Sequence, residues 1–119
     1  MDVTGVSWIG LKTNSKQRFS EMTDMFSKML SGWESKYGAD YMHFSNGHLM
    51  IEVYYEDAPA DEIVCGLEVR DIEDAVSEIK KLGLNPIGEK RCYDGSCWQH
   101  FLMPDGTEWE VKQSSRSQS

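Results

Sequence analysis

Apolar and polar residues follow a pattern that occurs twice along this chain. Trp8 to Thr13 and Val64 to Val69 are short apolar segments with a central glycine, and each leads into the 3.6-residue periodicity of an amphipathic helix. Strand-like alternation follows each helix. This self-similarity within a short chain predicts two copies of one β-α-β unit that share a sheet.

The periodicity also predicts the ends of the helices. Asn14 or Ser15 is expected to cap the first helix and Gly32 to end it, while Asp71 caps the second and Gly83 ends it. The predicted buried face of the first helix consists of Phe19, Met22, Phe26, Met29 and Leu30. That of the second consists of Ile72, Ala75, Val76, Ile79 and Leu82. The predicted strands are residues 6–12, 41–45, 48–55, 63–69, 86–92, 96–103 and 107–112, with a further short strand within 33–38.

Length and hydropathy set the domain organisation. A chain of 119 residues suits one domain, which we expect over residues 1–113, with modules of about 1–56 and 63–113 and a flexible tail over 114–119. The acidic, proline-containing segment 56–62 is expected to link the modules. No apolar run approaches the roughly 18 residues of a membrane helix, and no signal-like leader opens the chain. We therefore expect a cytoplasmic protein without a membrane partner.

Charge and cysteine content narrow the function classes. The formal net charge of −8 argues against a nucleic-acid partner and favours, weakly, a cationic ligand. Cys65, Cys92 and Cys97 form an odd set without CxxC spacing, so neither a disulfide framework nor a zinc site is expected. These cysteines are predicted to be free thiols.

The second half of the chain resembles a known superfamily. The residues that carry the resemblance run from Val69-x-Asp71-Ile72-Glu73-Asp74-Ala75-Val76 through Leu82-Gly83-Leu84-x-Pro86 to His100-Phe101-Leu102-Met103-Pro104-Asp105-Gly106-Thr107-x-Trp109-Glu110-Val111. They are similar to the vicinal oxygen chelate superfamily, which includes glyoxalase I, the bleomycin resistance proteins, fosfomycin resistance enzymes and extradiol dioxygenases. The resemblance implies an α+β fold in which two βαβββ modules form a curled mixed sheet around an open cleft, with helices on the outer face. It also implies a homodimer.

The resemblance places a divalent metal in that cleft, held by residues from four strands. Glu110 matches the carboxylate ligand of the second module, and Glu52 matches the carboxylate of the first. The two histidine positions fall on Trp8 and Val64, and neither side chain can bind a metal. We therefore expect no metal cofactor. A divalent metal is kept as an alternative in which another residue, such as His100 or His48, serves as a ligand.

Strand alternation indicates which residues face the cleft, because residues two apart share one face of a sheet. Phe101, Trp109 and Val111 are assigned to the core. The predicted ligand-binding residues are Trp8, Met50, Glu52, Tyr54, Val64, Trp98, His100 and Glu110. Aromatic faces beside carboxylates suit a planar or cationic organic molecule.

Two functions follow from this set of residues. The first is metal-independent binding of a small organic molecule, similar to the bleomycin resistance proteins and hence to antibiotic resistance. The alternative is a glyoxalase-like lyase, isomerase or dioxygenase that acts on a small carbonyl or diol substrate, with Glu52, Glu110 and His100 as base or metal ligands.

Each candidate residue also has a purely structural interpretation. Trp8 could fill the space that a histidine and a metal would occupy, and the two carboxylates could pair with Arg91, Lys12 or water. His100 could be a hydrogen-bonded structural residue. His43 and His48 flank a hairpin turn and are predicted to lie on the surface.

Overall fold

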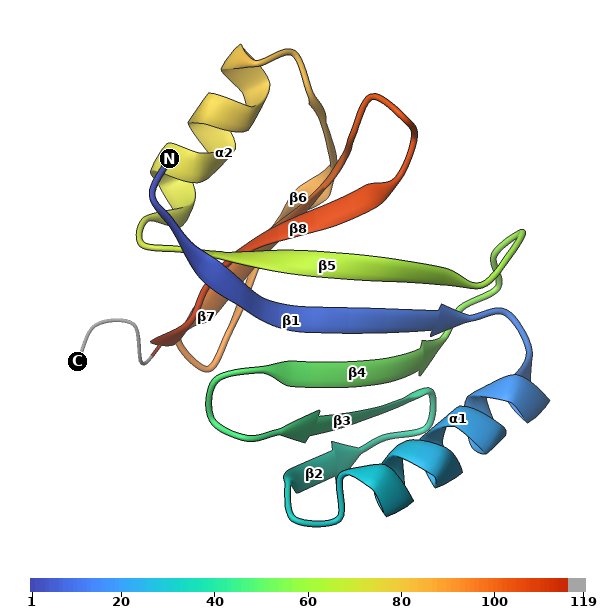
Figure 1. The fold of residues 1–119 in the computed structure, drawn as a ribbon. Coiled ribbons are helices and arrows are strands. Elements are labelled where there is room, and N and C mark those ends of the chain that lie inside the picture. Colours follow the sequence, from blue (N-terminus) through green and yellow to red (C-terminus); the bar gives the residue numbers. More distant parts are fainter. Residues whose placement is uncertain (116–119) are drawn as a thin grey trace. The chain divides into compact units, whose positions relative to one another are not determined.

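The computed structural model describes residues 1–115 and confirms the α+β class. The element order is strand, helix and three strands, repeated once. Contacts between residues divide the chain into two compact units (Figure 1). The first-half unit spans Trp8–Val64, and the second-half unit combines Met1–Ser7 with the described chain from Cys65 to Ser115.

The first-half unit is a four-stranded mixed sheet with one helix. Its strands lie in the order β2 (Glu34–Tyr37), β3 (Tyr41–Ser45), β4 (Met50–Tyr55) and the part of β1 (Val3–Thr13) that begins at Trp8. β1 runs parallel to β4, while β3 is antiparallel to both of its neighbours. Helix α1 (Lys16–Met29) packs on this sheet, where Phe26 meets Phe44 with 6.2 Å between ring centroids. The expected short strand within 33–38 is β2.

The Asn46-Gly47 hairpin forms as predicted, but β4 begins two residues later than expected. The Asn46 Oδ1 atom accepts hydrogen bonds from the backbone N–H groups of His48 and Leu49, both at 2.8 Å. These bonds hold the two residues in the turn, and Gly47 supplies the positive φ of 94° that the turn needs.

Helix α1 begins as predicted and ends early. Ser15 is the N-cap, because its Oγ atom accepts from the Arg18 backbone N–H at 3.2 Å. The prediction that Gly32 ends the helix is wrong, since Leu30 is the C-cap and Gly32 lies in the following turn. Met29, predicted to be buried, is 68% exposed because it falls on the last turn beyond the sheet contact.

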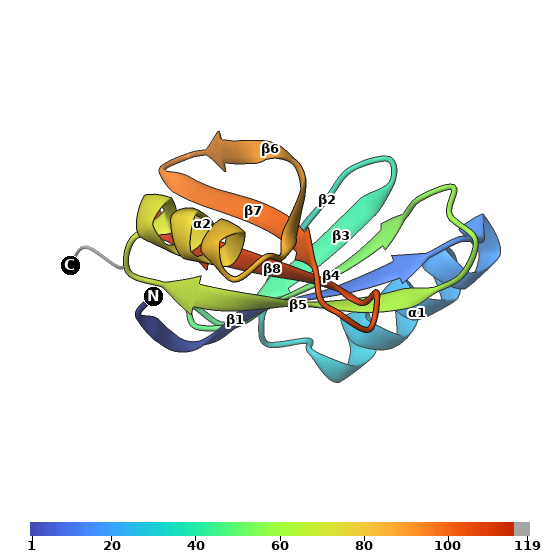
Figure 2. The ribbon, with the colours of Figure 1, turned by 90° about the horizontal axis from the view of Figure 1, so that it is seen from above.

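The second-half unit repeats this arrangement. Its strands lie in the order of the part of β5 (Glu62–Val69) that begins at Cys65, then β8 (Glu108–Gln113), β7 (Ser96–Leu102) and β6 (Asn85–Tyr93). β5 and β8 are parallel, and the other pairs are antiparallel. Figure 2 shows helix α2 (Ile72–Lys81) lying across β7 and β8. The core between them consists of Val69, Ile72, Ala75, Ile79, Phe101 and Val111.

The caps of α2 are those predicted from the sequence, but one residue of its predicted buried face is exposed. Asp71 accepts from the backbone N–H groups of Glu73 and Asp74 at 3.0 and 3.2 Å. Gly83 follows the helix with a φ of +82°. Leu82, predicted to be buried, is the C-cap and is 65% exposed, so the buried stripe ends one turn earlier at Ile79.

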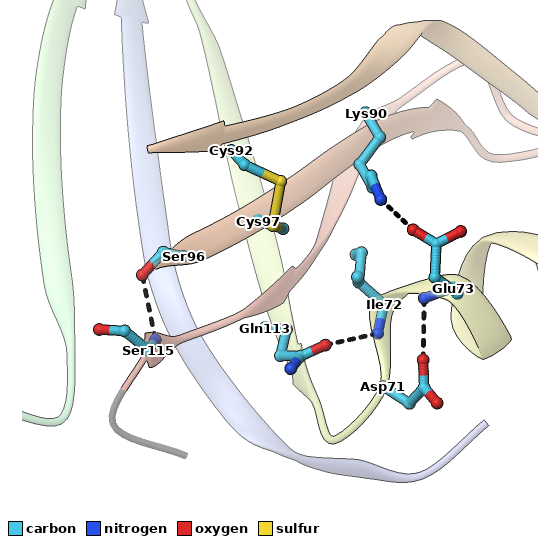
Figure 3. The surroundings of a disulfide bond; sticks show 9 residues. All are labelled: Asp71, Ile72, Glu73, Lys90, Cys92, Ser96, Cys97, Gln113 and Ser115. Carbon is cyan, nitrogen blue, oxygen red and sulfur yellow. Dashed lines mark hydrogen bonds and ion pairs between the residues drawn. A yellow bond between two sulfur atoms is a disulfide. The ribbon is translucent and has the colours of Figure 1, made fainter. Parts of the chain in front are cut away.

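The expectation that all three cysteines are free thiols is wrong. Cys92 and Cys97 form a disulfide across the β6–β7 hairpin (Figure 3), and Cys65 is free. The register places the two residues directly opposite each other, with 4.1 Å between their Cα atoms. The hairpin turn brings them into this position, with positive φ at Asp94 and Gly95. Their spacing of five residues is that of two opposite residues in a hairpin, and the absence of CxxC spacing therefore did not exclude a disulfide.

The C-terminal segment is described only as far as Ser115. Ser114 donates from its backbone N–H and its hydroxyl to Glu68 at 2.9 and 2.8 Å, and the Ser115 backbone N–H donates to Ser96 Oγ at 3.2 Å. Residues 116–119 of the predicted tail lie outside the described residues. Neither helix within residues 1–115 has the length and apolar composition needed to cross a bilayer.

Candidate functional site

The first-half unit presents Trp8 and Glu52 on one face of its sheet. Gly10 lies opposite Glu52 in the parallel register. The Trp8 ring lies over Gly10, because a Cβ atom added at Gly10 would meet three atoms of that ring. From this position the Trp8 Nε1–H donates a hydrogen bond of 3.0 Å to Glu52 Oε1. One oxygen of this carboxylate is therefore satisfied by an indole of the same unit.

Aromatic rings extend this face along the sheet. Trp8 and Tyr54 stack with 6.3 Å between ring centroids, and Tyr41 stacks on His43 at 5.8 Å. His43 is half-buried and lies directly opposite Glu52, so its predicted surface position is wrong. Alternation along β3 places it on the same face as Tyr41, and this spacing was the signal in the sequence that could have identified it.

The second-half unit also has a glycine and a histidine on either side of a glutamate, but the side chains around this row of three residues differ. Gly66 lies opposite Glu110, and His100 lies opposite Glu110 on the other side. The His100 Nε2 atom is 2.9 Å from Glu110 Oε2, and its Nδ1 atom is 2.6 Å from Glu108 Oε2. The predicted facing is confirmed, since Phe101, Trp109 and Val111 lie in or against the core beside α2. Glu108 was not among the candidate site residues, although it lies two residues before Glu110 in β8 and therefore on the same face.

The position of His100 between two carboxylates favours its protonated form. Burial by itself lowers the pKa of His100, but the hydrogen bond to Glu110 and the charges of Glu110 and Glu108 outweigh burial, so the pKa is raised from 6.5. Two carboxylate acceptors also require two N–H donors, which only the imidazolium ion provides. This row is therefore a carboxylate–imidazolium–carboxylate chain.

Glu110 is the most deeply buried member of that chain. Only 4% of the residue is exposed, and its Oε2 atom is occupied by His100. The Oε1 atom is buried and has no hydrogen-bond partner within residues 1–115. A buried carboxylate oxygen without a partner is costly, because it has lost hydration and gained nothing in return. Lys12, one of the partners considered from the sequence, lies 3.3 Å from Glu56.

The structure places the other predicted ligand-binding residues as follows. Met50 lies opposite Trp8 and is half-buried, and Trp98 is half-buried on β7. Val64 is fully buried. The assignment of Trp8, Met50, Glu52, Tyr54, Val64, Trp98, His100 and Glu110 to a ligand site stays a prediction.

The donor atoms present do not suit a divalent metal. A metal requires three or more donors that converge on one point. In the second-half unit both imidazole nitrogens are directed at carboxylates, and in the first-half unit Glu52 Oε1 accepts from Trp8. Within residues 1–115 no group of three or more His, Cys, Asp or Glu side chains is arranged to hold an ion. We therefore assign no chemical step to a metal.

Known structures share this fold at low sequence identity. The Mn(II)-bound glyoxalase from Novosphingobium aromaticivorans is 18% identical, with a TM-score of 0.71 over 94% of this chain and 39% of that chain. The present chain thus spans well under half of that glyoxalase. Methylmalonyl-CoA epimerase from Mycobacterium tuberculosis is 12% identical, with a TM-score of 0.64 over 93% of this chain and 88% of the epimerase. A glyoxalase/bleomycin resistance protein/dioxygenase superfamily member from Vibrio splendidus 12B01 is 15% identical, with a TM-score of 0.62 over 92% and 97% of the two chains.

No protein-family model and no curated protein sequence matches the chain. The structural likenesses nevertheless show that the chain has the vicinal oxygen chelate fold, as the sequence resemblance predicted.

Proposed function

We propose that the chain binds a small organic molecule without a metal, and that a cationic or hydrogen-bond-donating group of this molecule docks on Glu110. The observation that carries the proposal is the buried Glu110 Oε1 atom, which has no partner within residues 1–115. A ligand N–H or O–H group would supply the missing hydrogen bond, and a positive charge would strengthen it.

The internal repeat supports Glu110 over Glu52 as the docking point. Both glutamates lie opposite a glycine and a histidine, but Trp8 donates to Glu52. The residue equivalent to Trp8 in the second copy is Val64, which has no hydrogen-bond donor. The second copy therefore has no counterpart of the Trp8 donor, and the Oε1 atom of Glu110 stays available to a ligand. Sequestration of a cationic drug, as in the bleomycin resistance proteins, is one activity of this kind, and a homodimer in the cytoplasm is the setting we expect for it.

Glu110→Gln tests this proposal with two matched probes. Methyl 4-(aminomethyl)benzoate carries an ammonium group, and methyl 4-methylbenzoate is its neutral counterpart. The ammonium probe should bind the native protein more tightly, and Glu110→Gln should weaken its binding at least about tenfold, because a charge-assisted hydrogen bond is lost. Binding is measured by NMR titration of the labelled protein, whose spectrum also verifies that the variant is folded.

Glu21→Gln is the control, because it removes the same charge from an exposed position on α1. It should leave the affinity for the ammonium probe unchanged. Equal losses in both variants would attribute binding to net charge, and an unchanged affinity in Glu110→Gln would refute docking on Glu110.

A second candidate function is acid–base catalysis on a carbonyl substrate. The observation that favours it is the carboxylate–imidazolium–carboxylate chain, in which Glu110 could take the α-proton of a carbonyl substrate at Oε1, the C–H electron pair passing into the substrate's enolate, while Glu108 keeps the His100 imidazolium paired. The structural likeness to a methylmalonyl-CoA epimerase makes methylmalonyl-CoA the first substrate to try. A binding protein returns this compound unchanged, whereas a catalyst exchanges its α-proton in D₂O and loses that activity in Glu110→Gln.

A further inference from the structure

Two cations lie on the same face of the second-half unit as His100 and Glu110. Arg91 is directly opposite Trp98, and Trp98 is directly opposite Lys112. We call these three residues the basic row. Trp98 is two residues from His100 in β7, and Lys112 is two residues from Glu110 in β8. Residues two apart share a face of the sheet, so the basic row runs beside the His100–Glu110 pair.

The neighbours of the basic row confirm this facing. Lys90 forms an ion pair with Glu73 of α2 (Figure 3), and Cys97 packs against the core beneath α2. Both residues are therefore on the helix side of the sheet. Arg91 and Trp98, which follow them in sequence, point to the opposite side.

Neither cation of the basic row forms a salt bridge within residues 1–115. The acidic residue next to Lys112 in the register is Glu68, and both of its oxygens accept hydrogen bonds from Ser114. Arg91 is exposed, while Trp98 and Lys112 are half-buried. An indole face with a cation on each side suits a planar group that carries a negative charge.

We propose that this face binds a planar molecule with charges of both signs, whose carboxylate or phosphate group lies between Arg91 and Lys112 and whose ammonium or other donor group reaches Glu110. Two residues along a strand separate the two ends, which corresponds to roughly 7 Å. A single aromatic ring with substituents at opposite ends spans this separation, and Trp98 lies alongside it. The inference rests on the proposed function at its Glu110 end and adds the class of ligand.

The test compares 4-(aminomethyl)benzoic acid, which carries both charges, with its methyl ester, which keeps only the ammonium. The double variant Arg91→Gln/Lys112→Gln removes both cations of the basic row. Lys90→Gln is the matched control, because it removes one cation from the adjacent residue on the opposite face. Dissociation constants are measured by NMR titration at one ionic strength, and Trp98→Phe assigns the Trp98 indole resonance as a local reporter of binding.

We expect the native protein to bind the acid about tenfold or more tightly than the ester. The double variant should lose that preference and bind both probes equally, while Lys90→Gln should keep it. The Trp98 indole resonance should shift with the acid. An acid preference that survives the double variant, or no acid preference in the native protein, would overturn the basic row as the anion site.

The outcomes separate this inference from the proposed function. If Glu110→Gln weakens binding of the ester and the double variant changes neither affinity, docking on Glu110 stands and the anion site is wrong. If Glu110→Gln leaves the affinity for the ester unchanged while the double variant weakens binding of the acid, the anion site stands without Glu110. A native protein that binds neither probe contradicts both for this class of ligand.

Discussion

At the residue scale, Trp8 has two contacts that the sequence alone does not specify. Its indole N–H donates to Glu52, and its ring lies over Gly10. The ring needs the space that a side chain at position 10 would fill, because Trp8 is only 7% exposed and has little room to move away. A glycine is therefore required at position 10 because the Trp8 ring lies close to the backbone there, and not because the backbone has a positive φ.

Gly10→Ala should destabilise the protein by about 1–3 kcal/mol, since the added Cβ would lie 2.8 Å from Trp8 Cζ3 and closer still to two other ring atoms. Urea denaturation measures the change in the free energy of unfolding. Gly32→Ala is the control, because a Cβ at Gly32 meets nothing within 4 Å. In a Trp8→Ala background the cost of Gly10→Ala should largely disappear, and a cost that persisted there would show that the ring is not its cause.

At the element scale, the β6–β7 hairpin is held by more than its ladder of hydrogen bonds. The register shifts between Ile87 and Arg91, and the Gln99 side-chain amide donates to the carbonyl oxygens of Ile87 and Gly88 at 3.1 and 3.2 Å. The Cys92–Cys97 disulfide fixes the strand pairing beyond this irregularity. The disulfide thus secures the end of the hairpin that carries Arg91 and Trp98.

Removing this disulfide with Cys92→Ser/Cys97→Ser should lower the free energy of unfolding by about 2 kcal/mol, as expected for so short a closed loop. A dithiol reductant should destabilise the native protein by a similar amount and leave the double variant unaffected. Cys65→Ser, at the free cysteine, should keep the response to reductant. Native protein that does not respond to the reductant would show that the bond does not form in solution.

Elements governed by local periodicity and capping could be predicted from the sequence, and those governed by partners distant in the chain could not. Asp71, Ser15 and Asn46-Gly47 act on backbone groups within three residues, so their roles were evident. The end of α1, the exposure of Leu82 and the pairing of Cys92 with Cys97 depend on where a sheet ends or a strand folds back. The face of Glu110 followed from alternation along β8, whereas its bond to His100 required the β7–β8 register.

At the scale of the whole molecule, the fold is shared with a Mn(II)-bound glyoxalase, but within residues 1–115 of this chain no group of three or more His, Cys, Asp or Glu side chains is arranged to hold an ion. Each copy of the repeat carries one glutamate at the equivalent position, Glu52 and Glu110. The opening strands carry Trp8 and Val64, which supply no metal donor. Moreover, the Trp8 N–H occupies an oxygen of Glu52, and the imidazole of His100 occupies an oxygen of Glu110. Each of the two carboxylates is therefore engaged by a side chain of its own unit.

The native protein, equilibrated with Mn²⁺, Ni²⁺, Zn²⁺, Fe²⁺ or Mg²⁺ and freed of excess ion, should hold far less than one ion per chain and show no shift in melting temperature. Elemental analysis and thermal unfolding measure the two quantities. Trp8→His is the informative comparison, because it removes the donor to Glu52 and adds an imidazole to a face that already carries Glu52 and His43. This variant should be stabilised by Zn²⁺ or Mn²⁺ where the native protein is not. One ion per chain in the native protein would instead mean that the donors rearrange around a metal, and the proposal of metal-independent binding would then be wrong.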